Sequence, residues 1–126
     1  MRHGFALALF LACAPAAALA SASIDCETTD GSDNALIVNM DRDGTQDRIN
    51  DVVLQASGRT LRASAVPPEL EIGRRLFNER EIQLELLEPN PSRVIAMLRV
   101  RNGSDGAATG TLLVNGHIHQ VSCAFG

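Results

Sequence analysis

The stretch that decides the fold is residues 109–124, TGTLLVNGHIHQVSCA. Asn115-Gly116 separates two apolar runs, and this dipeptide is the strongest short-range signal for a β-hairpin. The pattern predicts strands over 109–114 and 117–124. Because side chains alternate along a strand, one face should carry Leu112, Val114, His117, His119, Val121 and Cys123. Cys123 is therefore expected to point toward the core.

Similar patterns recur upstream. Residues 80–86 and 93–101 alternate apolar and polar side chains around a proline-containing loop at 88–92. Apolar runs at 35–40, 49–55 and 59–66 are typical of further strands. Pro67-Pro68 interrupts this pattern, and residues 69–78 are expected to form an irregular crossover that could include one helical turn. The chain is thus predicted to be all-β: a small single-domain antiparallel β-sandwich or β-barrel of about seven to eight strands.

The first 20 residues have the organisation of an export signal. A short basic start, an apolar run from Phe5 to Ala14 and small residues at Ala18 and Ala20 match the three parts of a secretory signal peptide. The run is shorter than the roughly 20 residues of a transmembrane helix. We therefore expect a signal peptide over 1–20, one β-domain over 21–126, no transmembrane segment, and a periplasmic or secreted location.

Cys26 and Cys123 lie near the two ends of the predicted mature domain. Two cysteines in an oxidising compartment predict a disulfide, which here would join one end of the domain to the other. Two buried free thiols are the alternative. Cys13 is the third cysteine, and Phe10-Leu11-Ala12-Cys13 resembles a bacterial lipoprotein box, although such boxes usually carry Leu where this chain has Phe10. Cys13 is either discarded with the signal or lipidated, which would make the chain a lipid-anchored envelope protein.

Composition excludes several partners. The chain has no Trp, Tyr or Lys, and only Phe77 and Phe125 lie outside the predicted signal. Few aromatic side chains argue against binding of single-stranded nucleic acid, and a formal net charge of −4 argues against duplex DNA or an anionic membrane surface. The negative charge is concentrated between Asp25 and Asp51, which suggests a local site.

Residues 39–49, NMDRDGTQDRI, are the acidic part of the chain. Oxygen-bearing side chains alternate at Asn39, Asp41 and Asp43, and Gly44 and Asp47 follow. Calcium takes six to eight oxygen ligands, often from one tight loop. A solvated hairpin is the other interpretation, since Asp, Asn and Gly are also turn residues.

This segment resembles the D-x-D-x-D-G-x-x-D calcium loop of FG-GAP propeller repeats and, more loosely, of dockerins. The resemblance covers about eleven residues and departs from the pattern at Asn39, which stands for Asp, and at Arg42 and Arg48. It implies calcium as a cofactor, held by side-chain oxygens of Asn39, Asp41, Asp43 and Asp47 and by the backbone carbonyl of Thr45. An EF-hand fits less well, because position 12 would be Val52.

Catalytic motifs are weak. His117-x-His119 has a spacing that zinc sites use, but no third ligand is nearby in the sequence, and two half-buried histidines are the alternative. No serine lies in a nucleophile-elbow motif. We therefore predict no catalytic residues and no enzymatic activity.

The stretch Gln55 to Leu61, QASGRTL, is similar to the Ser-Gly-x-x-Tyr signature of exported bacterial inhibitors of C-type lysozyme, which are small β-barrels. Leu61 replaces the tyrosine, and no Lys-Gly partner exists in this chain. The sequence therefore predicts a non-catalytic exported domain, calcium-stabilised in one interpretation, that binds a protein or a component of the cell envelope. A periplasmic inhibitor of a hydrolase, with a protruding loop at 88–92 or 67–78, is the alternative.

Overall fold

The computed structural model describes residues 21–126 except 44–45, 90 and 104–105, so the predicted signal segment and Cys13 lie outside it. Within the described residues there are nine strands and no helix. The strands are β1 (Ser21–Thr28), β2 (Ala35–Asp43), β3 (Gln46–Ala56), β4 (Arg59–Arg62), β5 (Glu71–Phe77), β6 (Glu81–Pro89), β7 (Ser92–Asn102), β8 (Ala107–Val114) and β9 (His117–Phe125).

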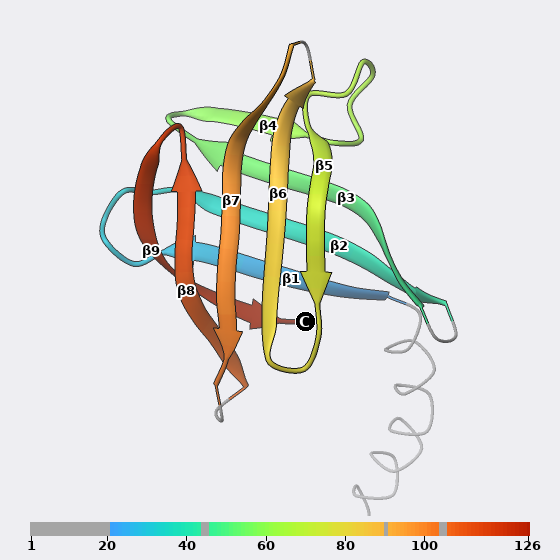
Figure 1. The fold of residues 1–126 in the computed structure, drawn as a ribbon, viewed down its shortest axis with the longest axis vertical. Coiled ribbons are helices and arrows are strands. Elements are labelled where there is room, and N and C mark those ends of the chain that lie inside the picture. Colours follow the sequence, from blue (N-terminus) through green and yellow to red (C-terminus); the bar gives the residue numbers. More distant parts are fainter. Residues whose placement is uncertain (1–20, 44–45, 90, 104–105) are drawn as a thin grey trace, which may run out of the picture.

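All nine strands belong to one sheet in the order β4-β3-β2-β1-β9-β8-β7-β6-β5, and each neighbouring pair is antiparallel. Figure 1 shows β1 to β4 crossing behind the upright strands β5 to β8, so the sheet curls over itself into a half-barrel. The all-β prediction is confirmed. The prediction of seven to eight strands is wrong. Of the two predicted architectures, the sandwich is wrong and the barrel is confirmed in part, because the single sheet curls into a half-barrel.

The missed strand is β5. We expected residues 69–78 to be an irregular crossover, because Pro67-Pro68 interrupts the strand pattern and Gly73 disfavours a helix there, yet β5 pairs with β6 at the sheet edge. The register shifts between Ile72 and Arg75, and the Glu85 carboxylate accepts a hydrogen bond of 3.2 Å from the Arg74 amide at this bulge. A Cβ on Gly73 would collide with that carboxylate. The glycine therefore makes room for the bulge.

The hairpin at Asn115-Gly116 forms as predicted. Val114 pairs with His117, and both turn residues have positive φ, 50° for Asn115 and 84° for Gly116, as a two-residue turn of this kind requires. Farther along β9, Cys123 pairs with Cys26 on β1 and forms a disulfide with it. Both cysteines are 1% exposed, so the predicted bond is confirmed and lies in the core. A disulfide is consistent with an oxidising, exported location.

The concave face of the sheet encloses an aliphatic core. Its fully buried larger side chains are Leu36, Leu54, Leu70, Leu84, Leu86, Leu98, Leu112, Val38, Val52 and Val100. Leu70 comes from the link between β4 and β5, the two edge strands of the sheet. The same link covers the edge of β4, because the Arg62 amide donates to the Glu69 carboxylate and the Glu69 amide donates to the Arg62 carbonyl, both at 3.1 Å. Among the described residues there is no helix long and apolar enough to cross a membrane.

Candidate functional site

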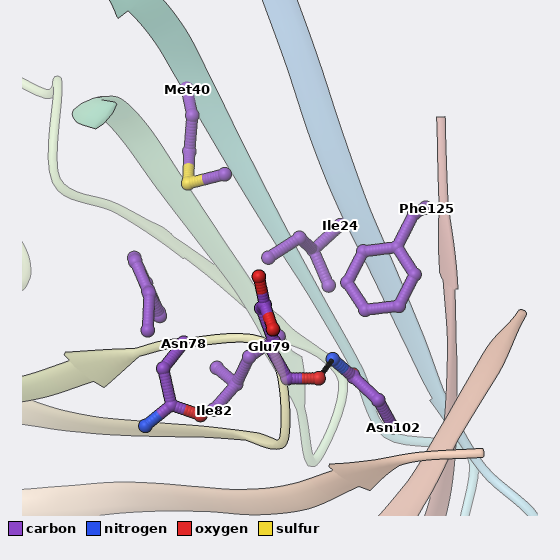
Figure 2. A pocket seen from close by; sticks show the side chains of 8 residues that line it. Ile24, Met40, Asn78, Glu79, Ile82, Asn102 and Phe125 are labelled. Atoms are coloured by element: carbon purple, nitrogen blue, oxygen red, sulfur yellow. Dashed lines mark hydrogen bonds between the residues drawn. The ribbon is translucent and has the colours of Figure 1, made fainter. Parts of the chain in front are cut away.

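A cavity of about 420 Å³ opens at the end of the half-barrel where β5 turns into β6. Six strand ends and the β5–β6 turn contribute to it: Ile24, Met40, Phe77, Asn78, Glu79, Ile82, Asn102 and Phe125 line the wall. Figure 2 shows these side chains around one shared space. The volume lies within the range of small-molecule sites, roughly 300–1,000 Å³.

The cavity is an extension of the core. Ile24, Met40 and Ile82 are buried on the concave face. Phe77 pairs with Ile82 and Phe125 pairs with Ile24, and residues opposite one another on antiparallel strands share a face. Phe125 is nevertheless 46% exposed, and Phe77 is half-buried. Apolar surface therefore continues from the interior to solvent at this end.

Hydrogen bonds fix the polar side of the cavity. The Asn78 side-chain oxygen accepts from the amides of Arg80 and Glu81 at 2.8 and 2.9 Å. The Asn102 side-chain amide donates to the backbone carbonyl of Glu79 at 2.6 Å, a bond drawn in Figure 2. The β5–β6 turn is thus tied to itself and to the end of β7. A wall that is already ordered lowers the entropic cost of binding.

The predicted calcium segment folds into the arms of the β2–β3 hairpin. The two strands stay paired along the whole predicted segment. From the start of the segment to its tip, the register is Asn39–Asp51, Asp41–Arg48, Arg42–Asp47 and Asp43–Gln46. Asn39 is exposed and Asp41 is half-buried. Thr45 and the side chains of 42–47 lie outside the described part of the chain. Within that part, no group of three His, Cys, Asp or Glu side chains is placed to hold a metal, and calcium binding stays a prediction.

The histidine pair has a partner that the sequence did not reveal. His119 Nδ1 lies 3.0 Å from Asp30 Oδ2, and Asp30 comes from the β1–β2 loop, 89 residues away. The pKa of Asp30 is lowered to about 2, first by a hydrogen bond with the Ser32 side chain, with further contributions from the Ser32 backbone and from His119. His117 and His119 line a hollow of about 220 Å³ with Ser32 and Ser57.

This arrangement orients an imidazole but does not complete a nucleophilic site. A catalytic histidine of that kind needs a hydroxyl or thiol within hydrogen-bond reach. Among the described residues, no hydroxyl or thiol forms a hydrogen bond with the His119 ring. The hollow supports no reaction assignment.

Sequence reasoning missed the cavity, and the scarcity of aromatic residues is the one feature of the sequence that relates to it. Phe77 and Phe125 are the only aromatic residues outside the first 20 residues, and both line this one space. Their positions in the sequence gave no reason to place them together. Comparison of this chain with protein-family models, with curated proteins and with solved structures finds no match.

Proposed function

We propose that this chain is an exported, non-catalytic β-domain that binds the apolar part of a small molecule or of an envelope component in the cavity between Phe77 and Phe125. The observation that carries the proposal is the placement of both phenylalanines. Neither is in the fully buried core, which is aliphatic, and both border the same opening. Exposed aromatic surface costs free energy in water, and an apolar ligand would recover part of that cost.

A neutral solvatochromic dye such as Nile red tests this proposal. Its fluorescence should rise and shift to the blue on addition of residues 21–126. Phe125→Ala should weaken binding by about 1 kcal/mol, or roughly fivefold, since the ring is half-exposed and a fully buried one would contribute about 1.5–3 kcal/mol. Ile118→Ala is the matched control, because Ile118 is also on β9, is 70% exposed and lies on the opposite face of that strand. Equal dye binding by both variants would contradict the proposal.

Calcium stabilisation is a separate part of the proposal, supported by the alternation of Asn39, Asp41 and Asp43 on β2. Side chains two residues apart share a face of a strand, so the side-chain oxygens of Asn39 and Asp41 start from the same side of the hairpin. Millimolar calcium should raise the melting temperature of the wild type, and Asp41→Asn should remove most of that rise. Asp33→Asn, a carboxylate in the β1–β2 loop, serves as the control. No heat of binding and no change in melting temperature would end the calcium hypothesis.

Inhibition of a hydrolase is the second candidate, favoured by the link between β4 and β5. The segments predicted to protrude, 88–92 and 67–78, are largely strand, since Pro89 pairs with Ser92 and β5 occupies 71–77. The link between β4 and β5 projects from the sheet in Figure 1. Within this link, Val66 is 96% exposed. An inhibitor that used this loop should lose activity against its target enzyme on Val66→Asp and keep it on Ile118→Ala.

A further inference from the structure

Glu79 is the only charged residue among the described residues that line the cavity. Its backbone carbonyl accepts from Asn102, but no described side chain forms an ion pair or hydrogen bond with its carboxylate. Figure 2 shows the carboxylate in the middle of the lining side chains, between Ile24 and Asn78. A ligand in this space therefore meets a negative charge as well as apolar walls.

The phenyl rings of Phe77 and Phe125 add a second attraction for a cation that lies over their faces. The face of a phenyl ring carries negative electrostatic potential, and cations with alkyl substituents bind over such faces. Met40 adds a polarisable thioether on the wall. Two phenyl rings, a thioether and a carboxylate around one space are complementary to a cation that also has apolar surface.

A bare metal ion fits this space less well. Calcium needs six or more oxygen ligands, and magnesium needs near-octahedral oxygen geometry. The Asn78 oxygen already accepts two backbone hydrogen bonds, and the Asn102 amide nitrogen is a donor to Glu79. This leaves the Glu79 carboxylate and the side-chain oxygen of Asn102 as the available side-chain oxygen ligands among the described lining residues, which are too few for a hard cation.

We infer that the cavity selects an organic cation, an ammonium group that carries alkyl substituents, over neutral and anionic apolar groups. This inference rests on the proposed function, because it assigns the ligand class of the same cavity. The ammonium lies against the Glu79 carboxylate and the phenyl rings, and its alkyl chain follows the surface of Ile24, Met40 and Ile82. Binding of this kind weakens as salt is added, since the carboxylate is exposed.

Three ligands of similar chain length compare a positive, a neutral and a negative head group: hexyltrimethylammonium, 1-hexanol and hexanoate. Affinities are measured by titration calorimetry on residues 21–126, and chemical shifts of the Ile24 and Ile82 methyl groups locate the bound ligand. The cation should bind about two- to fivefold more tightly than the alcohol, as expected for an exposed charge pair with some cation–π attraction. Hexanoate should bind more weakly than the alcohol.

Glu79→Gln should remove most of the cation's advantage over the alcohol, leaving only the attraction of the phenyl rings, and should leave the affinity of the alcohol unchanged. This substitution keeps the bond to Asn102, which uses the Glu79 backbone. Glu71→Gln, an exposed carboxylate on β5 outside the cavity, is the matched control and should leave the preference intact. If the alcohol binds at the cavity and the cation has no advantage, the inference is overturned while the proposed function stands. If no ligand shifts the two isoleucines, both are overturned.

Discussion

Removal of the disulfide should strongly destabilise this protein, because the bond closes a loop of nearly the whole described domain. Cys26 and Cys123 join β1 to β9, and this pair of strands connects the first four strands to the last five in the sheet order. The perturbation is the double variant Cys26→Ala/Cys123→Ala. It leaves small apolar side chains at two positions that are each 1% exposed.

The magnitude follows from the length of the closed loop. The bond spans a sequence separation of 97 residues, and on the chain-entropy model a loop of that size contributes about 4.7 kcal/mol at 25 °C. Small domains have a free energy of unfolding of only about 5–15 kcal/mol. With a urea dependence of about 2 kcal/mol per molar, the unfolding midpoint should fall by roughly 2 M.

Urea unfolding followed by circular dichroism measures this loss. Wild type treated with a reductant is the control, because it keeps both sulfur atoms and loses only the cross-link. Reduced wild type and the double variant should unfold at similar urea concentrations, both well below oxidised wild type. A loss under about 1 kcal/mol with an unchanged slope would refute the reasoning, because β1 and β9 would then be held together by sheet pairing alone.

Two further predictions concern single positions. Gly110→Ala should destabilise the protein by about 1–3 kcal/mol in the same urea assay, since an added Cβ would collide with the Arg99 carbonyl, and an unchanged midpoint would contradict that contact. Asp30 has a lowered pKa of about 2, so its contribution to stability is complete above the ordinary carboxyl pKa of about 4 and is lost as the pH falls toward 2. Asp30→Asn should therefore show a smaller drop in melting temperature between pH 5 and pH 2 than wild type, and parallel curves for the two proteins would argue against the effect.

Local patterns predicted most of the strands. The turn at Asn115-Gly116 and the alternation over 80–101 depend on interactions between residues close in sequence, and both hairpins form. The pairing of β1 with β9 is distant in sequence, yet the two cysteines marked it. The two cysteines thus identified a contact between distant parts of the sequence, which the periodicity of apolar residues cannot identify.

The failures share a physical cause. Strand β5 was missed because Pro67-Pro68 and Gly73 indicate irregular structure, and the Glu85 side chain that occupies the bulge belongs to another strand. The pairing of His119 with Asp30 and the meeting of Phe77 with Phe125 depend on how far the sheet curls. Curl is set by packing across the whole core, and no short stretch of sequence encodes it.

The central claim, that the cavity beside Phe125 is a binding site, is tested most directly by methyl-selective NMR of the isoleucines during titration with 1-hexanol. Ile24 and Ile82 line the cavity, and Ile118 and Ile37 lie elsewhere on the sheet. We predict saturable shifts of Ile24 and Ile82, with Ile118 and Ile37 unmoved and with the response reduced in Phe125→Ala. Shifts that are spread evenly over all four residues, or that are absent, would contradict it.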